Sequence, residues 1–183
     1  MWKQYFKKHA KRKPREQLVR AISYANKGNA LDLGSGTCIE TKYLVKQGFN
    51  VIAVDSAPEA KKYANKRFEF KNISFQEYKF PLNKFNLINA QFALPFYGKK
   101  GFNGFIKKII GSLKPKGVFV GQFFGKKDSW NIGKPELVFH VKQQVINLLS
   151  DMKILEFIEE EKDGKTASGN LKHWHIFHFI VQK

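Results

Sequence analysis

Short apolar runs alternate with amphipathic segments along the chain, a pattern typical of α/β proteins. Residues 51–54 read Val-Ile-Ala-Val, and a continuous apolar run of this kind is expected for a central parallel strand that is covered on both faces. The pattern predicts strands at 30–33, 50–55, 72–75, 85–90, 117–123, 153–160 and 173–181. It predicts helices at 38–48, 58–67, 101–113 and 135–150. We therefore expect a doubly wound, mostly parallel sheet of seven strands that closes with a hairpin.

The first 28 residues precede this alternation. Apolar positions recur at helical spacing at Trp2, Tyr5, Phe6 and His9, while Lys3, Lys7, Lys8 and Lys11 fall on the other side. An amphipathic segment of this kind can pack against the domain as a lid, lie on a membrane surface or form a disordered tail. After Pro14, the apolar positions indicate a second helix that ends near Gly28.

A glycine turn follows the first predicted strand, in the run Asp32-Leu33-Gly34-Ser35-Gly36. Neither Gly34 nor Gly36 carries a Cβ, so the backbone there can adopt positive φ and approach a ligand closely. Asp55 ends the second predicted strand about 20 residues later, which places its carboxylate beside the turn at the same sheet edge. This arrangement indicates a nucleotide site in which the acid accepts hydrogen bonds from ribose hydroxyls.

Two common nucleotide folds are disfavoured. A dinucleotide-binding turn needs a third glycine where this chain has Ile39, and a β-branched residue there leaves no room for a pyrophosphate. A P-loop needs Gly-Lys-Ser/Thr at the end of the turn, whereas residues 37–39 read Thr-Cys-Ile. NAD and ATP are therefore disfavoured as ligands.

The run at 32–36 instead resembles the Asp-x-Gly-x-Gly motif of class I S-adenosylmethionine-dependent methyltransferases, which also carry an acid at the end of the second strand. Residues 40–51, 85–91 and 113–120 fall where that family has its first helix, fourth strand and fifth strand. The segments 124–130 and 172–177 look like bacterial small-molecule methyltransferases of the tellurite-resistance type. The resemblance implies a Rossmann-like methyltransferase fold whose last strand runs antiparallel between the fifth and sixth.

The resemblance also implies S-adenosylmethionine as cofactor and S-adenosylhomocysteine as product. The residues it assigns to cofactor binding are Asp32, Gly34, Ser35, Gly36, Thr37, Asp55, Ser56, Ser74, Phe75, Asn89 and Ala90. Backbone N–H groups of residues 34–38 are expected to face the methionine end of the cofactor, with the ribose at Asp55 and the adenine near Phe75. Cys38 departs from the family, which usually has glycine there, so a side chain enters the region near the methionine.

Methyl transfer is an in-line displacement, so its rate depends mainly on alignment, and a general base is needed only when the acceptor must lose a proton. No catalytic base can be identified. Aromatic side chains can stabilise a sulfonium and exclude water, so an aromatic acceptor site is expected beyond the fifth and last strands. The candidate acceptor-binding residues are Tyr5, Asp128, Trp130, His140, His173 and His175. Two histidines on one strand without a third ligand do not predict a metal.

The chain has 183 residues, of which 43% are hydrophobic, and this length is typical of one domain. We expect a single methyltransferase domain with a basic helical segment or lid at 1–28, a cofactor-binding half at 29–123, and a substrate-side insertion with the C-terminal hairpin at 124–183. The single cysteine and the lack of a signal peptide or long apolar run favour a cytoplasmic protein. The oligomeric state stays open, with a monomer favoured.

The formal net charge of +18 raises a nucleic-acid alternative. Eight of the 33 basic residues lie in the first 20 positions, while six of the 15 acids fall between Asp151 and Asp163. DNA amino-methyltransferases usually carry Asn/Asp-Pro-Pro-aromatic after the fourth strand, but residues 89–92 read Asn-Ala-Gln-Phe. Cytosine C5 chemistry needs a cysteine nucleophile, and Cys38 lies in the cofactor turn instead. The remaining alternatives are an RNA methyltransferase and a non-catalytic cofactor sensor, beside the favoured small-molecule enzyme.

Overall fold

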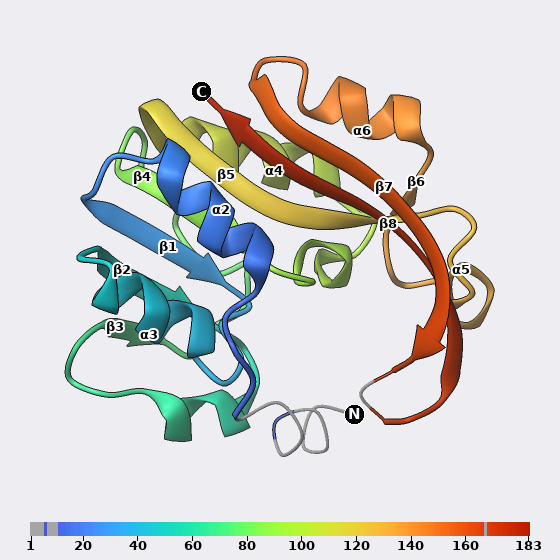
Figure 1. Cartoon of the computed structure of the whole chain (residues 1–183), viewed down its shortest axis with the longest axis horizontal. Helices are drawn as coiled ribbons and strands as arrows, with labels where there is room; N and C mark the ends of the chain where they lie inside the picture. Colours follow the sequence, from blue (N-terminus) through green and yellow to red (C-terminus); the bar gives the residue numbers. More distant parts are fainter. Residues whose placement is uncertain (1–5, 7–10, 167) are drawn as a thin grey trace.

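A computed structural model describes residue 6, residues 11–166 and residues 168–183. Its strands join into one eight-stranded sheet with the order β3-β2-β1-β4-β5-β8-β7, and β6 pairs with β5 beside this path (Figure 1). The strands are β1 (Asn29–Leu33), β2 (Asn50–Val54), β3 (Glu69–Lys71), β4 (Phe85–Ala90), β5 (Leu113–Gly125), β6 (Phe139–His140), β7 (Lys153–Lys165) and β8 (Leu171–Gln182). The helices are α2 (Glu16–Tyr24), α3 (Ile39–Lys46), η1 (Pro58–Tyr63), η2 (Leu94–Tyr97), α4 (Phe102–Ser112), α5 (Trp130–Gly133) and α6 (Lys142–Leu148).

Strands β1 to β6 pair in parallel, whereas β8 pairs antiparallel with both β5 and β7. The last strand therefore lies between the fifth and the strand that precedes it, as the resemblance implied. The predicted doubly wound, mostly parallel sheet with an antiparallel last strand is confirmed. The strand count rises from seven to eight because residues 139–140 form a short additional strand.

Helices cover both faces of the sheet. On one face, Leu18 and Ala21 of α2 and Leu44 of α3 pack on alternate residues of the central strands. On the other face, Phe105 and Ile109 of α4 join a larger cluster that also includes residues of α6. Since both faces are buried, the central strands are mainly apolar, and the apolar run at 51–54 is explained.

Two predictions for the segment after β2 are wrong. The strand expected at 72–75 is β3 at Glu69–Lys71, a short edge strand that pairs only with β2. The helix expected at 58–67 is the 3₁₀ helix η1, which begins at Pro58 and ends at Tyr63 because Ala64 is extended. Period alone does not separate a 3₁₀ turn from the start of an α-helix, and β3 has too few residues to show alternation.

The helix predicted at 135–150 is also corrected. Residues 137–140 are buried, and the last two of them pair with β5 as β6, so His140 lies on a strand and not on a helix. Helix α6 begins only after Val141, whose N–H donates to Oε1 of Gln144 at 3.0 Å, a capping contact that marks the start. The apolar residues before it pack against the sheet in extended form. At the other end of the chain, α2 ends at Tyr24, four residues before the expected Gly28.

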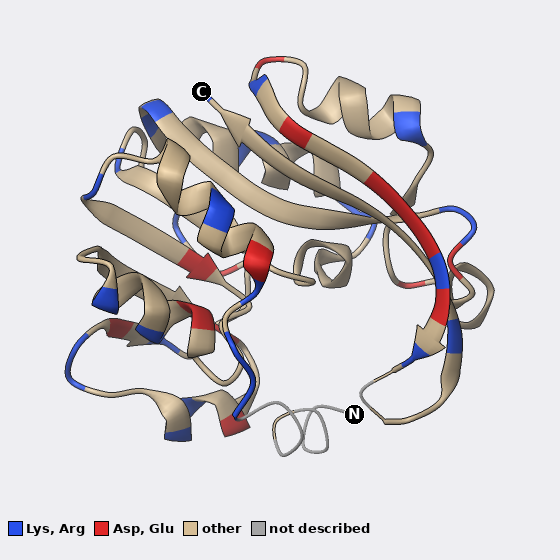
Figure 2. Cartoon of the chain, in the orientation of Figure 1, with Lys and Arg blue, Asp and Glu red and all other residues tan. Residues whose placement is uncertain are grey.

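The hairpin of β7 and β8 is longer than the sheet it joins. Pairing of β8 with β5 ends at Ile176, whereas β7 and β8 continue to pair as far as Lys165 and Leu171. The free part curves past the end of β5, and a run of acidic side chains at residues 159–161 lies along β7 where this part begins (Figure 2). It thereby builds a wall beyond the edge of the parallel strands, where ligands bind in open α/β sheets.

The N-terminal segment reaches the same edge. Phe6 is buried against Ala57 and Ala60, and its ring stacks on Tyr63 at 5.8 Å between centroids. Of the predicted amphipathic positions, Trp2, Tyr5 and His9 lie outside the described residues. None of the helices in the described ranges combines the length and apolar character needed to cross a membrane.

Candidate cofactor and acceptor site

The turn after β1 has the backbone geometry that its glycines predict. Gly34 and Gly36 have φ of 71° and 51°, in the left-handed region. The N–H groups of Gly34 and Ser35 donate to the carbonyl oxygen of Val54 at 2.8 and 3.1 Å, and the N–H of Cys38 donates to Ser35. These N–H groups therefore have partners within the protein, while the orientation of residues 34–38 toward the methionine end of a cofactor stays a prediction. They lock the turn to the end of β2.

Asp55 stands directly beside this turn. Its Oδ2 accepts from the N–H of Gly36 at 2.8 Å and its Oδ1 accepts from the N–H of Ala57 at 2.8 Å. The side chain of Asn72 donates to the backbone oxygens of Asp55 and Ala57, at 2.7 and 3.2 Å. Burial raises the pKa of the Asp55 carboxyl, and the two backbone N–H groups oppose that rise. A carboxylate has about four acceptor positions, so this one keeps acceptor capacity for hydroxyl groups.

Asp32 lies at the end of β1 and is buried. It accepts one hydrogen bond from Thr41 Oγ1 of α3. It accepts a second, at 2.7 Å, from Nδ2 of Asn89, the residue paired with Asp32 on the adjacent strand β4. Burial raises the pKa of Asp32 to about 7, and the nearby Glu40 carboxylate adds to the rise. Oδ1 of Asn89 is buried without a hydrogen-bond partner in the described part of the chain.

Three glutamines continue this polar row along the same face. Gln122 of β5 donates to Gln91 Oε1 at 2.7 Å and to Gln17 of α2, and its own oxygen accepts from the N–H of Phe92 at 2.8 Å. Gln17 donates in turn to the carbonyl oxygen of Phe179 at 3.0 Å. Nε2 of Gln91 is buried and has no protein partner among the described residues. The strand ends thus present one free acceptor, on Asn89, and one free donor, on Gln91.

The segment before α2 crosses over these strand ends. Arg12 forms a bidentate pair with Glu40 of α3, with Nη2 to Oε2 at 2.6 Å, and the N–H of Arg15 donates to the same carboxylate at 3.3 Å. The guanidinium of Arg15 lies 4.3 Å from the centroid of the Phe92 ring. Arg12 and Arg15 thus tie this segment to α3 and to Phe92.

Cys38 begins α3 in the left-handed conformation, with φ of 55°. Its thiol is fully buried and lies 3.9 Å from both the Ser35 hydroxyl and the carbonyl oxygen of Gly36. Burial raises the pKa of the thiol to about 12. The side chain that replaces the usual glycine therefore lies under the turn.

The predicted adenine-side residues differ in what they contact. Phe75 lies over the turn, 3.6 Å from the position a Gly34 Cβ would take, and stacks on Phe105. Ser74 donates its hydroxyl to Glu77 at 2.6 Å, and Ser56 is exposed. The remaining predicted residues, Thr37 and Ala90, are buried.

An aromatic cluster lies next to this turn. Ala93 is so close to Gly34 that a Cβ on the glycine would come within 2.5 Å of the alanine methyl. The preceding Phe92, with φ of 55°, packs on Phe124 and Trp174, with centroids 6.4 and 6.2 Å away. Trp130 completes the cluster, 5.7 Å from Trp174. Strain at a non-glycine residue is common at functional sites, and Phe92 stands between the turn and this aromatic wall.

A buried ion pair supports the wall from behind. The ammonium of Lys172 pairs with Asp128 and lies 3.8 Å from the ring centroid of Trp174 and 4.5 Å from that of Trp130. Asp128 also accepts from the N–H of Trp130 at 3.0 Å. Both side chains are fully buried. Asp128 therefore helps to hold the two tryptophans in place and does not face open space.

The histidines point elsewhere. His175 accepts from the N–H of Lys127 at 3.2 Å and contacts Glu159 at 3.1 Å, while His173 contacts Asp163 at 2.8 Å. His140 packs between Phe102 and Phe123, on the α4 face of the sheet. Tyr5 lies outside the described residues. Within the described ranges, no group of three or more His, Cys, Asp or Glu side chains is arranged to hold a metal ion.

Sequence reasoning missed several polar contributors to the site, namely Gln17, Glu40, Thr41, Asn72, Gln91 and Gln122. Gln91 could have been found, because it follows Asn89 by two residues and so points to the same side of β4. Gln17 and Gln122 are more than one hundred residues apart, and no local pattern connects them.

Similarity to known protein families indicates the type of domain to which this site belongs. Residues 30–117, which contain the turn, Asp55 and strands β1 to β4, match a family model described as a methyltransferase domain. The match to a methyltransferase domain spans just under half of the chain. The predicted enzyme class is thereby confirmed for this part of the chain. No curated protein matches the chain significantly.

Solved structures share the fold of this methyltransferase domain at low sequence identity. An S-adenosylmethionine-dependent methyltransferase from Methanosarcina mazei has 21% identity and a TM-score of 0.67, covering 88% of this chain and 95% of that one. TehB from Haemophilus influenzae has 15% identity and a TM-score of 0.80, covering 97% of this chain and 65% of that one. The N-methyltransferase NodS from Bradyrhizobium japonicum, in complex with S-adenosylhomocysteine, has 16% identity and a TM-score of 0.69, covering 92% and 84%.

Proposed function

We propose that this protein is an S-adenosylmethionine-dependent methyltransferase that acts on a small-molecule acceptor. Its fold resembles that of the bacterial protein TehB, and we assign it to the same type. The family match at residues 30–117 and the methyltransferase structures described above support the enzyme class. The small-molecule acceptor is supported by the 1,6-didemethyltoxoflavin-N1-methyltransferase from Burkholderia thailandensis, solved with bound 1,6-didemethyltoxoflavin and S-adenosylhomocysteine, which has a TM-score of 0.64.

The residues present fit the cofactor. The turn at Gly34 and Gly36 brings backbone to the strand edge, Asp55 is held beside it, and Phe75 covers it. We assign the ribose hydroxyls to Asp55 and the adenine to the surface beside Phe75. Asn89 and Gln91 present a buried oxygen and a buried N–H group that have no protein partner, and an orphaned buried polar group costs about 1–3 kcal/mol. The amino and carboxylate groups of a bound methionine moiety are the complementary partners.

We assign the acceptor to the aromatic wall of Phe92, Trp130 and Trp174. Bound S-adenosylmethionine supplies a methyl group on a cationic sulfur. The wall excludes water, which favours alignment of an acceptor without a dedicated base. Gln122 holds the backbone of Phe92 and Lys172 holds the two tryptophans, so both are positioning residues. In this proposal Asp128 supports the wall. The side chains of His140, His173 and His175 face away from the acceptor site.

The observation that carries the proposal is the Asp55 carboxylate fixed on the N–H of Gly36 at 2.8 Å, at the end of the parallel strands. Calorimetry with S-adenosylmethionine and S-adenosylhomocysteine tests it. Both are expected to bind the wild-type chain and to bind Asp55→Ala more weakly. If neither binds the folded protein at millimolar concentration, the cofactor assignment is wrong.

A screen with methyl-labelled cofactor tests the acceptor class. Thiols, amines, hydroxyls and metalloid anions are offered in parallel with RNA, and label is expected in a small molecule. Transfer to RNA, together with RNA binding that weakens steeply as salt rises, would favour the nucleic-acid alternative. Cofactor binding without transfer to any class would favour a sensor.

A further inference from the structure

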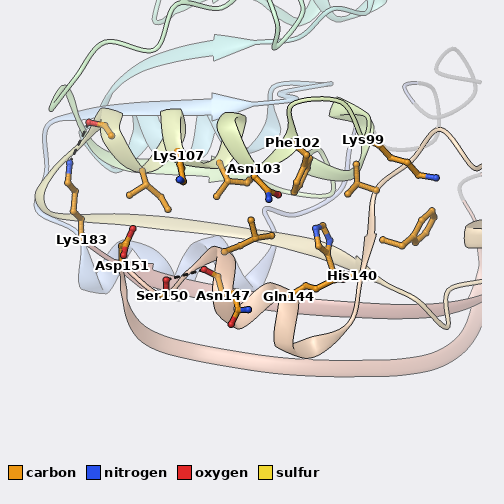
Figure 3. Close-up of a pocket in the computed structure, with 16 residues that line it drawn as sticks. Lys99, Phe102, Asn103, Lys107, His140, Gln144, Asn147, Ser150, Asp151 and Lys183 are labelled. Atoms are coloured by element: carbon orange, nitrogen blue, oxygen red, sulfur yellow. Dashed lines mark hydrogen bonds between the residues drawn. The ribbon is translucent and has the colours of Figure 1, made fainter.

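A groove of about 910 Å³ lies between α4 and α6, on the sheet face opposite α2 and α3 (Figure 3). Apolar side chains of both helices line it, including Ile106, Ile110 and Leu148. Polar groups of Asn103, Lys107 and Gln144 stand on its two walls. A lining that combines an apolar surface with a few polar groups is typical of small-molecule sites.

His140 gives this groove an unsatisfied polar group. Its ring is only 6% exposed and lies between the rings of Phe102 and Phe123, at 5.2 and 5.3 Å between centroids. Figure 3 shows the imidazole directed from β6 into the space between the helices. Nδ1 is fully buried without a hydrogen-bond partner in the described ranges. Burial also lowers the pKa of His140 to about 4, so the neutral ring has one N–H to donate and one nitrogen to accept.

The walls are positively charged. Lys99 lies in the turn before α4 and Lys107 on α4, and the described residues offer no ion pair to either of them. Lys183, at the far end, donates to the carbonyl oxygen of Leu113 at 2.8 Å. Asp151 is the acid among the lining residues, so the lining carries more positive than negative charge, which favours an anion.

The groove is separate from the proposed cofactor site. Ala93 contacts the glycine turn at the start of η2, whereas Tyr97 at its end packs on Phe102, the neighbour of His140. The helix η2 and its aromatic side chains thus stand between the turn and the groove. The backbone carbonyl of Pro95 in η2 accepts from the N–H of Val138, so the segment that carries His140 is tied to η2.

We propose that this groove binds a second small molecule, an amphipathic carboxylate. Its apolar body packs on Ile106, Ile110 and Leu148, and its carboxylate lies beside Lys107, with His140 as hydrogen-bond partner. Because η2 connects the groove to the glycine turn, an occupant would stabilise the segment that carries Phe92 and Ala93. The inference depends on the groove alone and not on the proposed methyl transfer.

The test uses 2-naphthoate as the probe and its neutral analogue 2-naphthamide, with calorimetry for affinity and backbone NMR for location. Naphthoate is expected to bind more tightly than the amide and to shift resonances of α4, β6 and α6. Lys107→Glu is expected to weaken naphthoate by about fivefold or more, which is the scale of an exposed charge reversal. The amide should be little affected. Lys108→Glu is the matched control, since it changes the same charge on α4 outside the groove.

His140→Phe should weaken both probes, with folding checked by circular dichroism. S-adenosylmethionine binding by Lys107→Glu is measured in parallel and is expected to equal wild type, so failure here is distinct from failure of the cofactor proposal. The proposal is overturned if naphthoate does not bind, if the two lysine variants behave alike, or if the shifted resonances lie at the glycine turn. A concentration-dependent dimer that excludes the probe would assign the groove to a second copy instead.

Discussion

The carboxylate of Asp55 accepts the N–H of Gly36 at 2.8 Å, which joins the end of β2 to the turn that follows β1. The acid expected to bind ribose therefore also holds the turn in place. Cofactor affinity and turn stability depend on the same side chain, and variants at this position must be interpreted with both in mind.

Asp55→Ala removes two acceptors from backbone N–H groups as well as the proposed ribose contact. We expect a loss of about 1–3 kcal/mol in the free energy of S-adenosylmethionine binding, measured by calorimetry. The exposed Ser56→Ala is the control and should bind as wild type. An unchanged dissociation constant in Asp55→Ala would contradict the ribose assignment.

The buried Asp32 predicts a pH dependence of stability. Burial raises its pKa to about 7, against an ordinary value of 3.8 for an aspartate carboxyl, so the folded state holds this proton to higher pH than the unfolded state. Its contribution is fully present below about pH 4 and is lost as pH rises through 7. Urea unfolding across this range should show a slope of up to about 1.4 kcal/mol per pH unit from this group.

Asp32→Asn is the matched variant for that measurement, since it keeps the shape and cannot ionise. Its unfolding free energy should fall less steeply with pH than that of wild type. Equal slopes for the two proteins would show that Asp32 does not titrate in this range.

Cys38 has φ of 55° and a fully buried thiol. Cys38→Ala loses the thiol contacts and keeps the unfavourable backbone conformation, whereas Cys38→Gly relieves it. We expect the glycine variant to be more stable than the alanine variant by about 1 kcal/mol in chemical denaturation. The reverse order would mean that the left-handed conformation carries no cost here.

The same burial protects the thiol chemically. With a pKa of about 12, almost no thiolate exists at neutral pH. Reaction of wild type with a thiol reagent such as dithionitrobenzoate should be slow in buffer and fast in denaturant. Fast labelling of the folded protein would contradict the buried placement.

The Lys172–Asp128 pair predicts coupling between two substitutions. Removal of one partner leaves a buried charge unpaired, which costs about 3–5 kcal/mol. Lys172→Met and Asp128→Asn should each lower the unfolding free energy, and the double variant should lose less than the sum. Additive losses would mean that the two side chains act independently. Trp130 and Trp174 fluorescence reports whether the aromatic wall changes with them.

Much of the fold could be predicted from local pattern. Strand β4 at Phe85–Ala90 matches its predicted bounds, and β1, β2, α3 and α4 differ from prediction by one or two residues at an end. These elements have a clear period and glycine or polar boundaries. Elements of three residues or fewer, such as β3 and β6, have too little pattern to be distinguished from loop or helix.

The residues of the site also separate into those that the sequence predicts and those that only the structure brings together. The sequence by itself determined the glycine turn, its acid at Asp55 and the parallel sheet edge where they meet, because backbone conformation and strand order depend on residue type and spacing nearby. Only the tertiary structure decided that Gln17, Gln91 and Gln122 form one row and that His140 lies behind η2. It also decided that Lys172 lies between two tryptophans. Those contacts join residues distant along the chain, and their geometry exists only once the strands that carry them have packed side by side.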